Sequence, residues 1–254
     1  MKFLYSGVTD YVVVLVSGTK GGSGKSVTAK ELVLIAANLG IQTSIVDRDA
    51  QGTSIKFMEK RQKLIEEGKK NGNALGDLVM PRAKSLEGRL PSELIAAEAK
   101  AGSKFIVVDL AGRDDELVRD ALKSVDAVVT PIRPTGEDLE EAEKFDEVVG
   151  AMWPNCPRLK AAFFMISQAP THGVRKKNQL PMAIKHLQSE KIQFINLMDM
   201  AISDRYQFVK ASSDGNKFSV TELEGGGQAV REVYGVFERI TDAVMSETLN
   251  ERAA

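Results

Sequence analysis

The sequence contains very little cysteine. Cys156 is the one cysteine among its 254 residues, which excludes an internal disulfide and any zinc or iron–sulfur site with four cysteines from one chain. A charged segment followed by a short apolar core is also missing, and no run of about 18 apolar residues occurs. We therefore expect a soluble protein of the reducing cytoplasm, without a secretion signal or a membrane span.

An excess of charge of either sign is missing as well. The 34 lysines and arginines almost balance the 35 aspartates and glutamates, which leaves a net charge of −1. Such a chain is not a polycation for nucleic acid, so any affinity for DNA has to come from a local surface. Hydrophobic residues make up 43% of the sequence, which is enough for one sizeable core.

Apolar runs rich in β-branched residues alternate with segments of helical period. The runs that predict strands are Tyr11–Ser17, Thr43–Asp47, Lys104–Leu110, Asp126–Ile132 and Ala161–Ser167, with weaker candidates near Leu78–Pro81 and Ile192–Ile195. Helices are expected at Lys25–Leu39 and Gln228–Leu249. This alternation predicts one α/β domain over residues 1–254, a doubly wound, mostly parallel sheet flanked by helices, with residues 1–10 as a short N-terminal extension.

Two further segments are expected to lie on the surface. The stretch Glu66–Asp77, "EEGKKNGNALGD", is typical of a surface loop. The lysine-rich helix Lys56–Lys70 alternates with glutamates and is expected to present a solvated face.

The segment Ser17–Lys30, "SGTKGGSGKSVTAK", joins an apolar strand to a helix through a glycine-rich turn. Such a turn lets successive backbone N–H groups point at phosphate oxygens, while a lysine adds charge and a hydroxyl ligates Mg²⁺. The strict G-x-x-x-x-G-K-[ST] pattern fails at its first position, which is Thr19. A turn without a ligand is the alternative that this context disfavours. The residues expected to bind the nucleotide here are Gly21, Gly22, Ser23, Gly24, Lys25, Ser26 and Val27.

The motif "KGGSGKS" resembles the deviant Walker A motif of ParA/MinD-type ATPases. The resemblance implies a P-loop NTPase in which Lys25 serves its own nucleotide and Lys20 reaches the phosphates of the partner in an ATP-dependent homodimer. A lysine supplied in this way acts like an arginine finger, because it neutralises charge on the transferred phosphoryl group. The alternative is a solvated loop lysine.

The segment "IVDRDAQGTS" is similar to the D-x-D-P-Q-G motif of the same family. The resemblance implies that Asp49 orients the attacking water and that Asp47 lies in or next to the magnesium shell. Ala50 replaces the usual proline. Both aspartates follow a predicted strand at the sheet edge where ligands of open α/β sheets bind. Capping of the next helix is the alternative role, and it is compatible with the first.

The segment "FIVVDLAGRDD" resembles a Walker B element. It implies that Asp109 holds Mg²⁺ through a water molecule, that Gly112 offers its amide to the γ-phosphate, and that Arg113 faces the partner or DNA. The next strand ends in "PIRPTGEDL", similar to the loop that borders adenine. Further nucleotide-binding candidates are therefore Pro131, Pro134 and Thr135, and also Ser167 of "SQAP", where the asparagine frequent in the family is absent and a plain turn is an alternative.

Features outside the phosphate loop separate the branches of the family. Only residues 1–11 precede Val12, so a winged-helix domain is not expected before the first strand. The C-terminal helix lacks the basic, bulky apolar face of a membrane anchor. Nitrogenase-type reductases and arsenical pumps require cysteines that this chain lacks. The sequence, including "AISDRYQFVKASSDGNKFSV", thus looks most like the small ParA branch, which moves plasmids or other cargo.

That resemblance implies DNA binding through phosphate contacts, which is independent of base sequence and weakened by salt. A solvated basic loop is the alternative for each single residue. The candidate residues are Arg175, Lys176, Lys177, Lys185, Arg205, Lys210 and Lys217.

The expected protein is a slow ATPase switch that uses ATP and Mg²⁺, and hydrolysis releases the dimer from DNA. A small ParB-like centromere-binding partner stimulates hydrolysis, and the ATP-bound form is associated with the nucleoid. The alternatives are an accessory ATPase for conjugation or organelle positioning, and a P-loop ligase of the dethiobiotin-synthetase class. The presence of Lys20 together with Asp49 argues against the ligase.

Overall fold

A seven-stranded sheet with the order β3-β2-β4-β1-β5-β6-β7 forms the centre of the protein. The computed structural model describes residues 11–18, 20–48, 52–110, 116–213 and 217–253, the last seven by their backbone alone. Within these residues every strand pair is parallel. The strands are β1 (Val12–Val16), β2 (Thr43–Asp47), β3 (Arg82–Ser85), β4 (Phe105–Asp109), β5 (Ala127–Ile132), β6 (Ala161–Ala169) and β7 (Asn196–Ser203).

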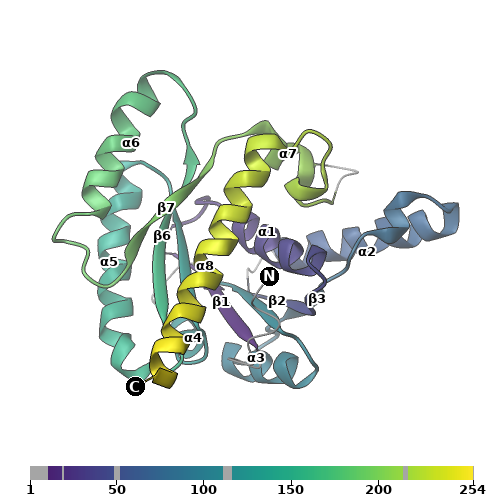
Figure 1. Cartoon of the computed structure of the whole chain (residues 1–254), viewed down its shortest axis with the longest axis horizontal. Helices are drawn as coiled ribbons and strands as arrows, with labels where there is room; N and C mark the ends of the chain where they lie inside the picture. The colour runs from purple at the N-terminus through teal and green to yellow at the C-terminus, as the bar shows by residue number, and fades with distance from the viewer. Residues whose placement is uncertain (1–10, 19, 49–51, 111–115, 214–216, 254) are drawn as a thin grey trace.

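Helices cover both faces of the sheet, and α8 crosses in front of it in Figure 1. They are α1 (Lys25–Asn38), α2 (Thr53–Asn71), α3 (Pro91–Lys100), α4 (Glu116–Leu122), α5 (Gly136–Met152), α6 (Gly173–Leu187), α7 (Tyr206–Ser212) and α8 (Gly227–Ala253). Among the described helices, none is both long enough and apolar enough to cross a membrane.

Each face of the sheet has its own hydrophobic core, because successive side chains of a strand point to opposite faces. Val12, Val14 and Val16 pack with residues of α1 and α8, whereas Val13 and Leu15 pack with residues of α3, α4 and α5. The strands are therefore apolar on both faces, as buried parallel strands are. The predicted doubly wound α/β fold is confirmed.

β1 lies between β4 and β5, so the chain runs outward from β1 in both directions. At such a switch point the loops after neighbouring strands diverge and leave a crevice at the carboxyl ends of the strands. Because the strands are parallel, the carboxyl ends of β1, β2, β4 and β6 all lie at this edge of the sheet. The crevice is therefore where a ligand is expected.

Two weak strands and one surface loop were predicted at the wrong positions. β3 begins at Arg82, just after the predicted Leu78–Pro81, and β7 begins at Asn196, just after Ile192–Ile195. The predicted loop Glu66–Asp77 continues α2 to Asn71 and then forms a 3₁₀ turn, Ala74–Asp77. The turn packs so closely on α2 that a Cβ at Gly68 would lie 2.3 Å from the nitrogen of Gly76.

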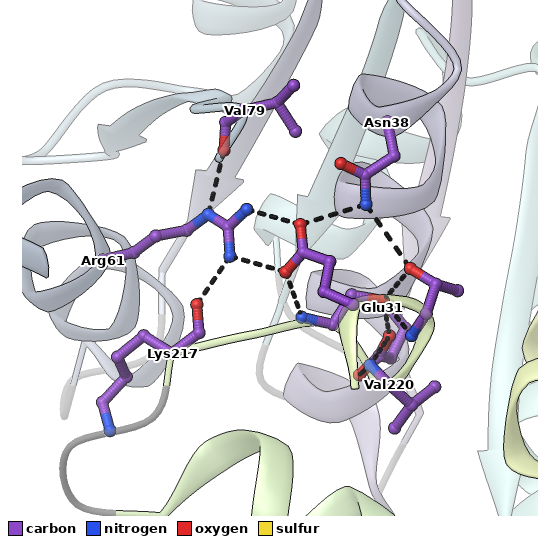
Figure 2. A network of polar contacts seen from close by, with 9 residues as sticks. Glu31, Asn38, Arg61, Val79, Lys217 and Val220 are labelled. Atoms are coloured by element: carbon purple, nitrogen blue, oxygen red, sulfur yellow. Dashed lines mark hydrogen bonds and ion pairs between the residues drawn. The ribbon is translucent and has the colours of Figure 1, made fainter. Parts of the chain in front are cut away.

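Figure 2 shows a buried polar network that joins α2 to α1 and to the segment before α8. The Arg61 side chain is 0% exposed and forms an ion pair with Glu222, with 2.6 Å between Nη2 and Oε1. It also donates to the carbonyls of Val79 (2.9 Å) and Lys217 (2.6 Å). The prediction of a solvated face for this helix was therefore wrong at Arg61, because Glu222 and the two carbonyls satisfy its charge and its donors.

Glu31 of α1 belongs to the same network. Its carboxylate accepts hydrogen bonds from the hydroxyl of Ser219, at 2.6 Å, and from the backbone N–H of Val220, at 3.2 Å. Burial raises the pKa of Glu31 to about 7, although these hydrogen bonds and Lys30 act in the opposite direction. α1 is thus connected through polar groups to a segment almost 190 positions away.

Candidate nucleotide-binding site

The loop between β1 and α1 is shaped by two glycines. Gly22 and Gly24 have φ angles of 78° and 91°, in the left-handed region that residues with a side chain rarely adopt. Gly24 is the N-cap of α1 and has no side chain that could cap the helix, and the first turn of α1 contains no acidic residue. The positive end of the helix dipole is therefore not compensated by an acid in the helix itself, which makes this end suited to an anion.

The two lysines of the loop point to different partners. Lys25 folds back over its own loop, and its Nζ donates to the carbonyl of Lys20 at 2.5 Å. The ammonium of Lys20 instead pairs with Glu137 in the first turn of α5 and lies 3.8 Å from Asp138. Asp138 is buried and also accepts hydrogen bonds from Arg133. The ammonium of Lys25 thus stays at the loop itself, whereas the ammonium of Lys20 is held at the start of α5.

Two buried aspartates lie side by side at the ends of neighbouring strands. Asp47 of β2 and Asp109 of β4 are in register, and each is 2% exposed. Ser54 bridges them, because its backbone N–H donates to Asp47 (2.9 Å) and its hydroxyl donates to Asp109 (2.6 Å). Ile55 also donates its N–H to Asp47. Asp47 therefore caps α2, as the capping alternative expected.

Burial raises the pKa of Asp109 to about 6, and the neighbouring Asp47 contributes to the rise. Hydrogen bonds from Ser54 and Ser26, together with the charge of Lys25, act in the opposite direction. A hydroxyl and two carboxylates beside a phosphate loop are the oxygen ligands that Mg²⁺ prefers. Ser26, Asp47 and Asp109 thus fit a magnesium ion, which would also compensate the negative charge that burial disfavours.

A pocket of about 380 Å³ lies beside the phosphate loop, within the size range of small-molecule sites. The described residues that line it are Gly24, Val27, Thr28, Lys30, Ser167, Gln168, Ile202, Ser203, Asp204, Arg205, Phe208, Val209 and Ser212. It therefore lies between α1, the end of β6 and α7. Among the residues expected near the base, Ser167 lines this pocket.

Pro131, Pro134 and Thr135 are not among the described residues that line the pocket. Pro131 lies within β5, and Thr135 is the N-cap of α5, where its hydroxyl donates to Asp138. Thr135 thus shares Asp138 with Lys20 and Arg133. Asp49 and Gly112, with Ala50 and Arg113, lie outside the described residues.

The candidate DNA-binding residues fall into two groups. Arg175, Lys176, Lys177 and Lys185 are exposed on α6, and Lys210 is exposed on α7; both helices lie in the upper part of Figure 1. The other two residues, Arg205 and Lys217, are held by the protein itself.

Arg205 pairs with Glu232 of α8, with 2.7 Å between Nη2 and Oε1. Although burial of Glu232 opposes the effect, hydrogen bonds from Arg205 and Ser203 lower the pKa of this carboxyl. Lys217 is 7% exposed and donates to the carbonyls of Ser212 and Ser213. Both side chains thus have partners within the protein and are less exposed than the five candidate residues of α6 and α7.

Sequence reasoning missed several residues around the loop. Ser54 bridges the two aspartates, Arg133 donates a hydrogen bond to Asp138, and Gln168 donates to the carbonyl of Gly22 at 2.8 Å. The position of Ser54 at the start of a helix after an acidic strand end was a usable signal. The contact of Gln168 with Gly22 joins residues 146 positions apart. The contact of Arg133 with Asp138 spans five positions and depends on the local backbone geometry. Sequence composition reveals neither contact.

A family model described as ATPase MipZ matches residues 11–152, more than half of the chain. The chain belongs to this ATPase family. As a MipZ-family protein it is a ParA/MinD-type ATPase, which confirms the relationship inferred from "KGGSGKS". No curated protein matches the sequence.

Solved structures of the same type share the fold of this MipZ-family chain. McdA from Cyanothece, solved in complex with ATP, is 13% identical, with a TM-score of 0.66 over 92% of this chain and 97% of McdA. MinD from Aquifex aeolicus is 13% identical, with a TM-score of 0.62 over 91% and 97%. A plasmid partition protein from Borrelia burgdorferi is 16% identical, with a TM-score of 0.56 over 92% and 99%. At such identities the likeness concerns the fold alone.

Proposed function

We propose that this MipZ-family protein is an ATP-dependent switch. In this proposal it binds ATP and Mg²⁺, forms a homodimer, adheres to DNA without sequence preference, and positions a plasmid or another cargo together with a small centromere-binding partner. Slow hydrolysis, stimulated by the partner, releases the dimer. The observation that carries the proposal is that the two loop lysines have different positions. The ammonium of Lys25 contacts its own loop, whereas the ammonium of Lys20 pairs with Glu137 at the start of α5.

The phosphates bind the loop in this proposal. Gly21–Val27 supply backbone N–H groups and Lys25 supplies charge, while Ser26, Asp47 and Asp109 hold the metal. Mg²⁺, when bound, neutralises negative charge on the phosphate oxygens. Asp49 orients the attacking water, and Gly112 donates its amide to the γ-phosphate. The bridge through Ser54 supports this assignment, because it holds the two carboxylates side by side at the ends of β2 and β4.

Lys20 serves the partner's nucleotide in this proposal. Its side chain is 30% exposed and its partner Glu137 is 83% exposed. An ion pair this open to solvent contributes little to stability, so exchanging Glu137 for a phosphate requires little energy. This accessibility supports a role for Lys20 between two protomers.

The base of ATP occupies the pocket beside Ser167 in this proposal, and α6 and α7 supply the DNA contacts. The basic residues proposed for phosphate contacts are the exposed Arg175, Lys176, Lys177, Lys185 and Lys210, with the less exposed Arg205 and Lys217 beside them. A plasmid partition protein among the structural neighbours supports plasmid or cargo positioning. The protein is proposed to reside in the cytoplasm and on the nucleoid. An accessory ATPase for conjugation or organelle positioning would share all these features and differ in cargo.

A DNA-retardation assay with ATP, with ADP and without nucleotide tests the proposal. We expect retardation of unrelated DNA fragments in ATP alone, with an affinity that falls steeply as salt increases. The Lys25→Ala variant is the control, because it should fail to bind DNA under every condition. Binding that is independent of nucleotide and of salt would contradict the switch and would favour a scaffold that acts through protein contacts.

A further inference from the structure

The end of β6 contacts two consecutive carbonyls of the phosphate loop. The hydroxyl of Ser167 donates to the carbonyl of Ser23 at 2.6 Å, and the side-chain amide of Gln168 donates to the carbonyl of Gly22 at 2.8 Å. Ser23 and Ser167 are 2% and 3% exposed. The Ser167 bond is therefore shielded from water, and its loss would leave a buried carbonyl without its partner.

These carbonyls control the direction of the N–H groups that a phosphate would meet. A peptide unit is planar and trans, so its C=O and N–H point in opposite directions. The carbonyl of Gly22 shares its peptide with the N–H of Ser23, and the carbonyl of Ser23 shares its peptide with the N–H of Gly24. A donor that fixes each carbonyl on the outside of the loop thereby fixes the next N–H, and it also polarises that group toward an anion.

The backbone of Gln168 adopts an uncommon conformation at this contact. Its φ angle is 50°, in the left-handed region that is uncommon for a residue with a side chain. Strain of this kind persists where surrounding contacts over-determine the conformation, and it clusters at functional sites. Here the left-handed turn accompanies the contact of the side chain with Gly22.

Ser167 and Gln168 also line the pocket of about 380 Å³ beside the loop, together with Gly24. The two side chains therefore touch the proposed base pocket on one side and the phosphate loop on the other. We propose that Ser167 and Gln168 are positioning residues that hold the phosphate loop in its anion-binding shape, rather than residues that read the base. The inference rests on the proposed nucleotide site.

The test compares ATP with inorganic tripolyphosphate, which has the phosphates but no base. Isothermal titration measures both affinities, the weaker one by competition, for the wild type, Ser167→Ala and Gln168→Ala. We expect each substitution to weaken both ligands by the same factor, between about twofold and tenfold for the loss of one hydrogen bond. Ser167→Thr keeps the hydroxyl and should restore both affinities together.

A matched control is Gln62→Ala, which removes a side-chain amide whose bond to Glu66 lies on the exposed face of α2. It should leave both affinities unchanged. Thermal unfolding of each variant, read by circular dichroism, verifies that the fold persists. If Ser167→Ala fails to fold, Gln168→Ala decides the question, because Gln168 is exposed.

Loss of ATP affinity with unchanged tripolyphosphate affinity would overturn the inference, because it would mean that these side chains contact the base. Unchanged affinity for both ligands would overturn it as well. A wild-type protein that binds neither ligand would instead contradict the proposed function, and this inference with it. The proposed function and the positioning role thus fail in distinguishable ways.

Discussion

Asp109→Asn should make the nucleotide-free protein more stable while it impairs magnesium binding. Burial, together with Asp47, raises the pKa of Asp109 from its usual 3.8 to about 6. A difference of about two pKa units corresponds to about 3 kcal/mol at 1.36 kcal/mol per unit. Asparagine has nearly the same shape and lacks the charge that burial disfavours, and its amide can donate to Asp47.

The sign of the pH dependence follows from the raised pKa. The folded protein binds the Asp109 proton more tightly than the unfolded chain, so the contribution of this group to stability falls as pH rises from about 4 to about 6. Above that range the charged carboxylate is fully present and stability stays reduced. The asparagine variant lacks this loss, so its advantage should be largest, up to about 3 kcal/mol, near pH 7.5.

Urea denaturation of both proteins at pH 5, 6 and 7.5, without nucleotide and with a chelator, measures this difference. Titrating groups far from Asp109 are common to the two proteins and cancel in the comparison, and Asp47, whose charge interacts with Asp109, is relieved of the same repulsion in the variant. Asp77→Asn, at an exposed position, is the control and should show no such advantage. An Asp109→Asn protein with the stability and pH dependence of the wild type would refute the reasoning, because Asp109 would then carry no buried charge.

Three further predictions concern the loop and the buried network. Lys25→Ala should abolish ATP binding in calorimetry, because Lys25 is the cation that we propose for the protein's own nucleotide, and an unchanged dissociation constant would contradict that role. Arg61→Met should lower the free energy of unfolding by about 3–5 kcal/mol, because it leaves the carboxylate of Glu222 without its buried partner. The double variant Arg61→Met, Glu222→Leu should recover part of this loss. If Arg61→Met alone is as stable as the wild type, the ion pair does not stabilise the fold. Glu31 has a pKa raised to about 7, so its own contribution to the stability of the wild type should fall by about 3 kcal/mol as pH rises from about 4.5 to 7. Glu31→Gln should remove this part of the pH dependence in denaturation curves, and a pH dependence equal to that of the wild type would contradict the buried charge.

The central strands of the sheet could be predicted from the sequence because they are apolar on both faces. The predicted Thr43–Asp47 has the same bounds as β2, and the predicted Lys104–Leu110 exceeds β4 by one residue at each end. The edge strands were displaced. β3 contains Arg82 and Lys84, and β7 contains Asn196 and Asp199, so their polar residues hid strands that form through pairing with a neighbour rather than through an apolar pattern.

The parts of the candidate site that lie within single short segments were accessible from the sequence. The motif around Lys20 and Lys25, and the strand ends at Asp47 and Asp109, were each identified by their resemblance to family motifs, and the structure places the two aspartates in register on neighbouring strands. The pairing of Lys20 with Glu137 bridges 117 positions. Such a contact depends on how the loops after β1 and β5 meet in space, which only the folded chain determines.

The buried ion pair of Arg61 and Glu222 could not be predicted from the sequence either. Arg61 lies in a lysine-rich helix whose charges suggested a solvated surface, yet its side chain is fully buried. The residue that satisfies it, Glu222, is 161 positions away. Helical charge patterns distinguish a polar face from an apolar one, but they do not reveal a buried cation whose partner comes from a distant segment.

Analytical ultracentrifugation with and without ATP and Mg²⁺ tests the central claim most directly. The wild type should change from a monomer to a dimer when ATP is added. Lys20→Ala should bind ATP and stay monomeric, because it lacks the ammonium proposed for the partner's phosphates. Lys56→Ala, on the exposed side of α2, should dimerise like the wild type. A normal ATP-dependent dimer of Lys20→Ala would contradict the proposed switch.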